Sequence, residues 1–239
     1  MRQIASWAWR RSYMPPLKTA ERGVVVHVER LKLCPEYGGE LEWSKYRQHP
    51  IVYITGDGRS LKEDTDEFES WDIPHDLYAV NRSLIYHERP VQHWAAIDLE
   101  ESIWFAENVN SKIQNGHNIF RHTIGYAPLA YDVCWQMDYP FENDYQRRVW
   151  AGNSGYFAIL TALHMGYEKI IIGGMGIKRE PHWYESADAD GPNWAGIVYT
   201  QWMDFKMLVP EAEKVKSMSG YSAFILGKAS KEWLTNRLV

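Results

Sequence analysis

The chain has 239 residues, of which 45% are hydrophobic and 24% charged, and its net charge is −5. This composition is typical of a soluble globular protein that can bury a full core, and the scattered Lys and Arg, outnumbered by Asp and Glu, argue against a nucleic-acid-binding protein. Cys34 and Cys134 are too few and too far apart for a disulfide framework or a thiolate metal site, and no apolar run approaches a membrane span, so we expect reduced thiols in a cytoplasmic protein.

Residues 1–22 form a basic and aromatic segment interrupted by Pro15-Pro16. The apolar stretch at its start is too short for a signal peptide before Arg10-Arg11. We expect an N-terminal arm that is either loose or docked on a partner subunit, and the docked arm would hold a homo-oligomer together. Residues 23–239 are expected to form a single domain, which begins with a strand at 23–28.

A short β-branched strand is predicted at 51–55, and it ends at the turn Gly56-Asp57-Gly58-Arg59-Ser60. Glycines without Cβ atoms let an anion approach the backbone N–H groups and the positive end of the next helix. A lone Gly-x-Gly after a strand is more often a plain tight turn. The acidic stretch 63–72 that follows is interpreted as the solvated face of a helix and not as a metal cluster.

Further strands are predicted at 77–80, ending at Asn81-Arg82-Ser83, and at 94–97, ending at Asp98. A helix-like segment at 99–109 follows, so that strand, polar residue and helix alternate as in βαβ units. Residues 119–124 are predicted to form a strand, and the aromatic, turn-rich stretch 126–145 is expected to be an excursion over the site.

A second glycine loop, Gly152-Asn153-Ser154-Gly155, precedes a helix that is apolar nearly all round and is therefore expected to be buried. Asn153 or Ser154 is the expected N-cap and Gly166 the stop, before an interior strand at 169–172 that ends at Gly173-Gly174. Ligands of open α/β sheets bind outside the carboxyl ends of such strands. We therefore expect the two glycine loops to lie side by side and to line one anion pocket with unpaired peptide N–H groups.

Residues 204–214 are predicted to form a surface helix interrupted by Pro210, and residues 230–238 a closing helix. Trp183, Tyr184 and Trp194 lie in loops beside the expected site, where flat rings either stack on a base or sugar or simply fill space.

His182 is the candidate for acid or base chemistry, because an imidazole with a near-neutral pKa suits the deprotonation of an acceptor hydroxyl, although a lone loop histidine is more often a surface residue. Asp188-Ala189-Asp190 resembles an Asp-x-Asp metal signature, but no strand precedes it, and a calcium loop fails because Ile197 stands where Glu is needed. No metal site is therefore assigned. The other histidines show no ligand spacing, and His164 is interpreted as a core residue.

Five short motifs in order carry a resemblance: Gly56-Asp57-Gly58-Arg59-Ser60-Leu61, Val80-Asn81-Arg82, Asn153-Ser154-Gly155, Gly173-Gly174-Met175-Gly176 and His182-Trp183-Tyr184. Together they resemble the superfamily of domain-of-unknown-function 115 (DUF115) proteins. That superfamily groups motility-associated glycosyltransferases and 6-hydroxymethylpterin diphosphokinase-like proteins with the bacterial sialyltransferases of glycosyltransferase family forty-two. The resemblance covers roughly residues 50 to 185.

The resemblance implies a Rossmann-like α/β fold, with a mainly parallel sheet, helices on both faces and a bound nucleotide. The implied binding residues are Gly56, Gly58, Ser60, Asn81, Asn153, Ser154 and Gly155. Asp57, Arg59, Asp98 and Gly174, at the same strand ends, complete the set of candidate binding residues. This chain departs from the pattern at Arg59, where relatives usually have Pro, and at Gly176, where they tend to have Asp. It also lacks a clear counterpart of the sialyltransferases' catalytic histidine, so transfer of sialic acid is not expected.

Three functions remain open after the sequence analysis. The first is a nucleotide-dependent group transferase, a glycosyltransferase with a nucleotide-sugar donor in which His182 assists the acceptor. The second is a diphosphokinase-like enzyme that uses ATP and Mg²⁺. The third is a non-catalytic Rossmann-like module for binding or assembly, of the kind that phage genomes encode.

Overall fold

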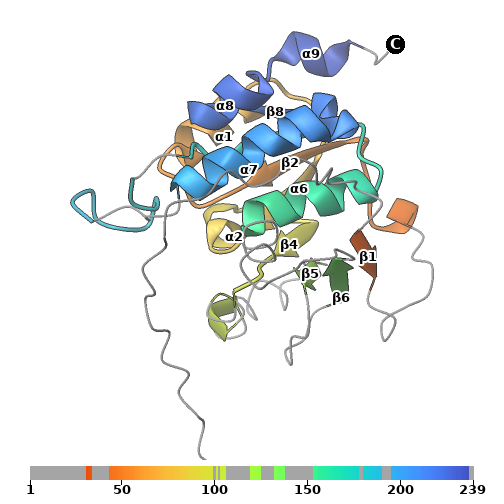
Figure 1. The fold of residues 1–239 in the computed structure, drawn as a ribbon, viewed down its shortest axis with the longest axis horizontal. Coiled ribbons are helices and arrows are strands. Elements are labelled where there is room, and N and C mark those ends of the chain that lie inside the picture. The colour runs from red at the N-terminus through yellow and green to blue at the C-terminus, as the bar shows by residue number, and fades with distance from the viewer. Residues whose placement is uncertain are drawn as a thin grey trace, which may run out of the picture.

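The computed structural model describes residues 31–33, 43–98, 101, 103–105, 119–124, 132–137, 153–177, 180–189 and 195–236. These residues form one eight-stranded sheet in the order β1-β6-β5-β4-β3-β2-β7-β8. β1 pairs with β6 in the antiparallel direction, and every other neighbouring pair is parallel. The predicted Rossmann-like α/β class with a mainly parallel sheet is confirmed (Figure 1).

The strands are β1 (Leu31–Leu33), β2 (Ile51–Thr55), β3 (Asp76–Val80), β4 (His93–Ala95), β5 (Phe120–Ile124), β6 (Val133–Met137), β7 (Lys169–Gly173) and β8 (Val215–Ser217). The helices are α1 (Leu61–Glu69), α2 (Ser83–Tyr86), α6 (Ser154–His164), α7 (Ala195–Leu208), α8 (Gly220–Leu226) and α9 (Lys231–Thr235), with 3₁₀ turns η3 (Trp43–Lys45) and η4 (Pro210–Lys214).

The order of the parallel strands reverses between β2 and β7. The chain runs outward from β2 through β3, β4, β5 and β6, and then returns to place β7 and β8 on the other side of β2. In open α/β sheets this reversal creates the crevice in which ligands bind, at the carboxyl ends of the strands. For this chain the reversal brings the loops after β2 and β7 together.

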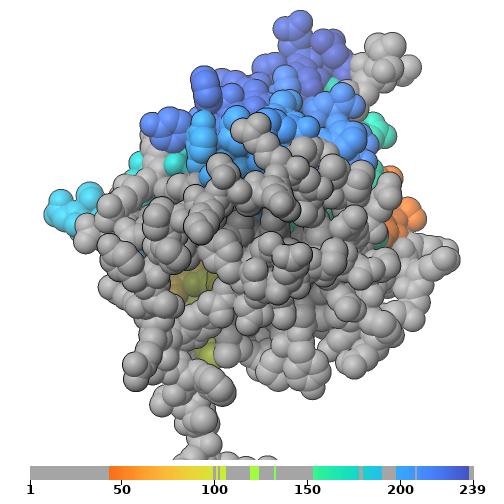
Figure 2. All heavy atoms as spheres, viewed as in Figure 1, coloured from red at the N-terminus to blue at the C-terminus, as the bar shows by residue number. Residues whose placement is uncertain are grey.

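Successive side chains of the central strands enter two separate cores. Ile170 and Ile172 of β7 pack in the core under α6, α7 and α8, whereas Ile171 packs in the core that holds Phe68 of α1 and Leu234 of α9. Both faces of the sheet are therefore covered, which is why the isoleucine run has no polar alternation. Helices α6, α7 and α8 lie over the face turned to the viewer in Figure 1, and the side chains of α7 and α8 form the upper part of the surface in Figure 2.

Helix α6 has the boundaries that its sequence predicts. The Asn153 side chain accepts hydrogen bonds from the N–H groups of Gly155 and Tyr156, at 2.8 and 3.2 Å, and so caps the first turn. Gly166, with φ +80°, ends the helix in the left-handed region. Every residue from Ser154 to Leu163 is buried, as the apolar pattern predicts.

Several elements differ from the prediction, chiefly among the shorter ones. The helix expected at 204–214 is confirmed in part: α7 begins earlier, at Ala195, and ends at Leu208, and the residues from Pro210 form a 3₁₀ turn, so Pro210 interrupts the element as predicted. Strand β6 lies within the expected excursion at 126–145, and β8 and α8 were not anticipated. The arm at 1–22 and the strand at 23–28 lie outside the described residues. Among the described helices, none is both long and apolar enough to cross a membrane.

Candidate functional site

The first glycine turn packs against the loop after β7. The Gly56 N–H donates to the Gly173 carbonyl at 2.9 Å, and the Gly58 N–H donates to the Gly174 carbonyl at 2.7 Å. A Cβ atom on Gly58 would lie 2.6 Å from the Gly174 carbonyl oxygen, so only glycine fits. The expectation that these peptide N–H groups are unpaired is wrong, since both complete the contact between two loops.

Gly174 also holds this contact together. Its φ is +65°, in the left-handed region that favours glycine, and a Cβ atom there would lie 2.5 Å from the Gly56 carbonyl oxygen. Its N–H donates to the carboxylate of Asp64 at 2.8 Å. Gly174, predicted to bind a nucleotide, therefore has both backbone polar groups engaged within the protein.

Asp64 joins three loops at the carboxyl edge of the sheet. Besides the Gly174 N–H, its Oδ2 accepts hydrogen bonds from the hydroxyls of Ser60 and Ser219, each at 2.9 Å. The interpretation of the acidic stretch as a solvated face is wrong at this residue, which is only 3% exposed. Its neighbours Glu63, Asp66 and Glu67 are exposed as predicted.

The two glycine loops do lie close together, but Met175 fills the space between them. A Cβ atom on Gly56 would lie 2.7 Å from Met175 Cγ, and one on Gly155 would lie 2.9 Å from Met175 Sδ. The Gly155 N–H is taken by the Asn153 cap. The N–H groups of Gly56, Gly58 and Gly155 therefore do not line the predicted common anion pocket as unpaired hydrogens.

A polar cluster lies instead at the carboxyl ends of β2 and β3. Asp57 Oδ2 accepts a hydrogen bond from the Arg82 N–H at 3.3 Å, whereas Oδ1 is buried and has no partner among the described residues. Burial raises the pKa of the Asp57 carboxyl to about 8, and the nearby Glu101 carboxylate adds to the shift. The Asp57 carboxyl is therefore mostly protonated and neutral at pH 7.

Asn81 is fixed in an unusual backbone conformation beside Asp57. Its φ is 52°, in the left-handed region, where Asn is tolerated better than most residues. Its N–H donates to the Ala95 carbonyl at 3.0 Å, and its carbonyl accepts from Trp94 Nε1 at 2.8 Å. These bonds fix the backbone of Asn81. The side-chain Oδ1 is buried without a partner among the described residues, so part of the hydrogen-bonding capacity of the side chain is unused.

Arg82 supplies positive charge to this cluster. Its Nε lies 3.2 Å from Glu101 Oε1, and its guanidinium carbon lies 5.0 Å from the centre of the Tyr184 ring and 5.5 Å from that of Trp104. Two aromatic rings and one carboxylate thus restrict the guanidinium, which suits a group that receives an anion in a set geometry.

The turn 182–185 brings His182 to the same cluster. The Glu185 carboxylate lies 3.0 Å from His182 Nδ1 and 2.7 Å from the His182 N–H, and the imidazole stacks on Tyr184 at an interplanar angle of 5°. The hydrogen bond from the His182 N–H is the main reason why the pKa of Glu185 is lowered, so Glu185 stays a carboxylate. An Nδ1–H bonded to that carboxylate leaves Nε2 free of the ring proton, as a base requires.

Trp183 ties this turn to the loop after β2. Its backbone N–H donates to the Asp57 carbonyl at 2.9 Å, and residues 58 and 182 form an antiparallel bridge. The indole Nε1 is buried and has no partner among the described residues. Three neighbouring loops therefore each contribute one buried polar atom that the described residues leave unpaired.

The remaining predicted site residues lie around this cluster or apart from it. Arg59 Nη2 donates to the Glu185 carbonyl at 3.1 Å, so Arg59 supports the turn 182–185. Ser154 Oγ accepts from the Ile97 N–H at 3.4 Å, which links α6 to the loop after β4, and Asp98 of that loop is exposed. Asp188 is exposed, whereas Asp190 and Trp194 lie outside the described residues. Within the described ranges, no group of three His, Cys, Asp or Glu residues is placed to hold a metal ion.

Glu101, Trp104 and Glu185 also belong to the cluster, although they were not predicted from the sequence. The spacing of His182 and Glu185, three residues apart in a loop, was a visible signal for a histidine and its carboxylate partner. Glu101 and Trp104 gave no such signal, because they reach Arg82 only through the packing of the segment that follows β4. Comparison of the chain with protein-family models, curated proteins and solved structures found no match.

Proposed function

We propose that the protein is a nucleotide-dependent group transferase, a glycosyltransferase that moves a sugar from a nucleotide-sugar donor to a hydroxyl acceptor. The observation that carries this proposal is the set of unpaired buried atoms Asp57 Oδ1, Asn81 Oδ1 and Trp183 Nε1. Each unpaired buried polar group costs roughly 1–3 kcal/mol, which a ligand with matching groups recovers. Their position at the carboxyl edge, beside the reversal of strand order, is where such folds bind ligands.

The chemistry of these groups suits a polyhydroxylated, anionic ligand. Ribose and sugar hydroxyls donate and accept, and so match a protonated Asp57 carboxyl, the Asn81 amide and the Trp183 N–H. A neutral Asp57 does not repel a phosphate, and Arg82 supplies the compensating charge. Because the glycine N–H groups are engaged within the protein, the proposed phosphate contact falls to Arg82.

His182 is the proposed general base. As the acceptor oxygen forms its bond to the anomeric carbon, its proton passes to His182 Nε2, and the bond between that carbon and the phosphate oxygen of the donor breaks. The electron pair of the broken bond leaves with the nucleotide. Glu185 stabilises the imidazolium through Nδ1–H, which lowers the free energy of the charged state.

Thermal unfolding in the presence of CMP, UDP, GDP and ATP, with and without Mg²⁺, tests the proposal. At a concentration 100 times the Kd, a bound nucleotide adds about 2.7 kcal/mol to the free energy of unfolding, which raises Tm by roughly 5–10 °C for a chain of this size. We expect at least one nucleotide to raise Tm and the corresponding nucleotide-sugar to be turned over. An ATP effect with an absolute Mg²⁺ requirement would favour the diphosphokinase instead.

Asn81→Gly is the sharpest variant for this assay. Glycine removes the side-chain amide and adopts φ 52° without strain, so the fold is retained while the nucleotide-induced rise in Tm is lost. Asp72→Gly is the matched control, because Asp72 also has φ 52° but is exposed beyond the end of α1. If no nucleotide raises Tm, the transferase proposal fails, and a binding or assembly module becomes the better interpretation.

A further inference from the structure

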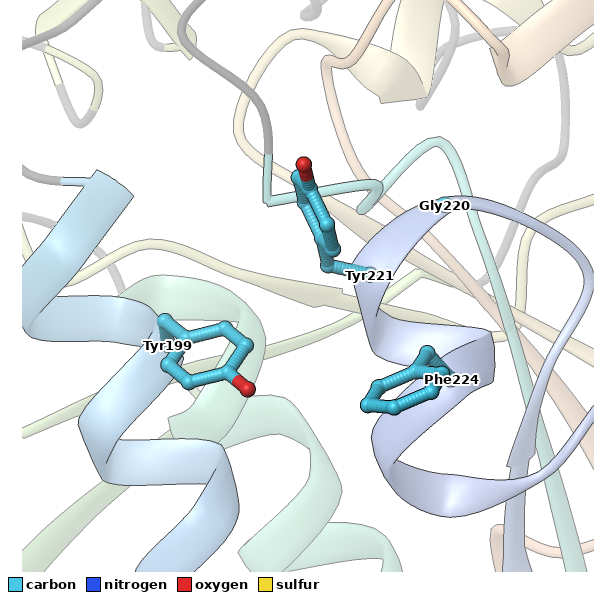
Figure 3. Close-up of a pocket in the computed structure, with 4 residues that line it drawn as sticks. All are labelled: Tyr199, Gly220, Tyr221 and Phe224. Atoms are coloured by element: carbon cyan, nitrogen blue, oxygen red, sulfur yellow. The ribbon is translucent and has the colours of Figure 1, made fainter.

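A hollow lies near the carboxyl edge of the sheet, between α7 and α8. It is lined by Tyr199, Gly220, Tyr221 and Phe224 and has a volume of about 360 Å³ (Figure 3). Figure 3 shows Tyr199 extending from α7 with its hydroxyl end toward Phe224, while Tyr221 projects from the start of α8. The Tyr199 and Tyr221 rings are nearly perpendicular, at 88°, with centres 6.3 Å apart. The two tyrosine rings thus meet edge to face, and Phe224 lines the hollow beside them.

These rings are far more exposed than large apolar side chains usually are. Phe224 is 81% exposed, Tyr221 55% and Tyr199 36%. Phe224 is not among the residues that pack in either core, so the fold does not depend on its side chain. A group of exposed aromatic rings that the fold does not require marks a surface that binds something.

The hollow is held in a fixed position relative to the candidate site. The Tyr221 N–H donates to the Gly176 carbonyl at 3.0 Å, so the start of α8 is bonded to the loop after β7. Ser219, two residues before Tyr221, donates to the Asp64 carboxylate that also binds Ser60 and Gly174. Both the hollow and the polar cluster therefore border the loops that Asp64 joins.

We propose that this hollow binds one neutral pyranose ring of a saccharide acceptor. The proposal rests on the proposed transferase function, and it names the acceptor class for that site. The described lining residues carry no charged side chain, so they would give a charged occupant no counter-charge. Its size is at the lower end for ligand sites, which suits one ring rather than a whole nucleotide.

A pyranose fits this lining better than a nucleobase does. A sugar ring has an apolar face of C–H groups that packs on aromatic rings, and hydroxyls at its edge that reach the phenol groups of Tyr199 and Tyr221. A base presents amide-like donors and acceptors in its plane, and the described lining offers only the two phenols to read them.

Ligand-detected saturation-transfer NMR on the full chain tests this proposal without any donor. The probes are lactose, maltose and cellobiose, with cytidine, uridine and adenosine as the competing class. We expect signals from the pyranose C–H protons of at least one disaccharide, and a loss of at least 10-fold in affinity in Phe224→Ala. Phe224 is so exposed that this variant keeps the fold, which circular dichroism checks.

Met207→Ala is the matched control, because Met207 on α7 is 65% exposed but does not line the hollow. It should leave the saccharide signals unchanged. The proposal is overturned by the absence of saccharide signals, by signals that Phe224→Ala leaves intact, or by a Phe224-dependent response to nucleosides alone. It is equally overturned if light scattering shows that Phe224→Ala dissociates a dimer, since the rings would then be an interface between copies.

This outcome is separate from that of the nucleotide assay. If nucleotides fail to raise Tm but Phe224-dependent saccharide binding is found, the transferase proposal fails and a saccharide-binding site remains. If nucleotides raise Tm but no saccharide binds, the donor site stands and the acceptor proposal is wrong.

Discussion

Two histidines buried at the heart of the sheet should make the free energy of unfolding depend on pH. His93 and His122 lie on neighbouring strands and are 0% exposed, and His93 Nδ1 lies 3.1 Å from His122 Nε2. On its other side His93 Nε2 lies 3.0 Å from the hydroxyl of Tyr167, which donates to the Asp76 carboxylate at 2.7 Å. This chain of hydrogen bonds is complete when both imidazoles are neutral, and the burial of both rings away from water disfavours an added positive charge.

The magnitude follows from the shift at His93. Burial lowers the pKa of His93 from its ordinary value of 6.5 to about 4, and burial also lowers that of His122. Between these two pH values the unfolded chain binds more protons than the folded chain, so the free energy of unfolding falls as the pH falls through 6.5. At about 1.4 kcal/mol per pH unit, His93 alone removes about 3 kcal/mol by pH 4.

Urea unfolding of the wild type and His93→Gln at several pH values between 7 and 4 measures this effect. At pH 7 the variant should be less stable by about 1–3 kcal/mol, because it leaves buried partners unpaired. That difference should shrink by at least about 2 kcal/mol toward pH 4, since glutamine takes up no proton.

The control for this experiment is Tyr78→Phe. It removes a buried hydroxyl that bonds Thr161 at 2.9 Å, but no group that titrates in this range, so its loss of stability should be the same at every pH. If the curves of the wild type and His93→Gln run parallel from pH 7 to 4, the buried pair does not resist protonation and the reasoning is refuted.

Three further predictions concern the candidate site. Gly58→Ala should lower the free energy of unfolding by about 1–3 kcal/mol, because its Cβ would lie 2.6 Å from the Gly174 carbonyl oxygen. In Gly176→Ala the new Cβ atom would have its nearest neighbour 3.8 Å away, so the free energy of unfolding should change by less than about 0.5 kcal/mol. Equal losses of stability for the two alanine variants in urea unfolding would contradict the packing argument. Asp57→Asn should stabilise the protein by at least about 1 kcal/mol more at pH 9 than at pH 6. In the folded wild type Asp57 has a pKa of about 8, so it retains its proton where the unfolded chain has lost it, and the stability of the wild type falls as the pH rises toward 8. A gain in the stability of Asp57→Asn that is the same at both pH values would argue against a buried acid. His182→Gln should lower kcat by roughly 10²- to 10⁴-fold and leave the nucleotide-induced rise in Tm unchanged. Glu185→Gln should lower kcat less and shift the pH dependence of kcat. If His182→Gln released nucleotide from the donor at the wild-type rate, His182 would not be the base.

Long periodic segments could be predicted from the sequence because their pattern is local. The buried helix α6, its Asn153 cap, its Gly166 stop and the apolar strand β7 all depend on residues within a few positions of one another. The proximity of the two glycine loops was also predictable, because parallel strands place their carboxyl ends at one edge of the sheet. Short elements such as β8 and α8 were missed because three to seven residues carry little periodicity.

The sequence by itself thus determined the α/β class, the central strands and the proximity of the two glycine loops at one edge of the sheet. Only the tertiary structure decided what the residues at that edge do. Gly58 and Gly174 serve a contact between loops and not a phosphate, and Asp64 is a buried acceptor and not a solvated acid. These roles depend on partners far away in the chain, such as Ser219, which lies 155 residues from Asp64. No local pattern encodes such a pairing, because it is fixed by the return of the chain to β7 and β8 beside β2.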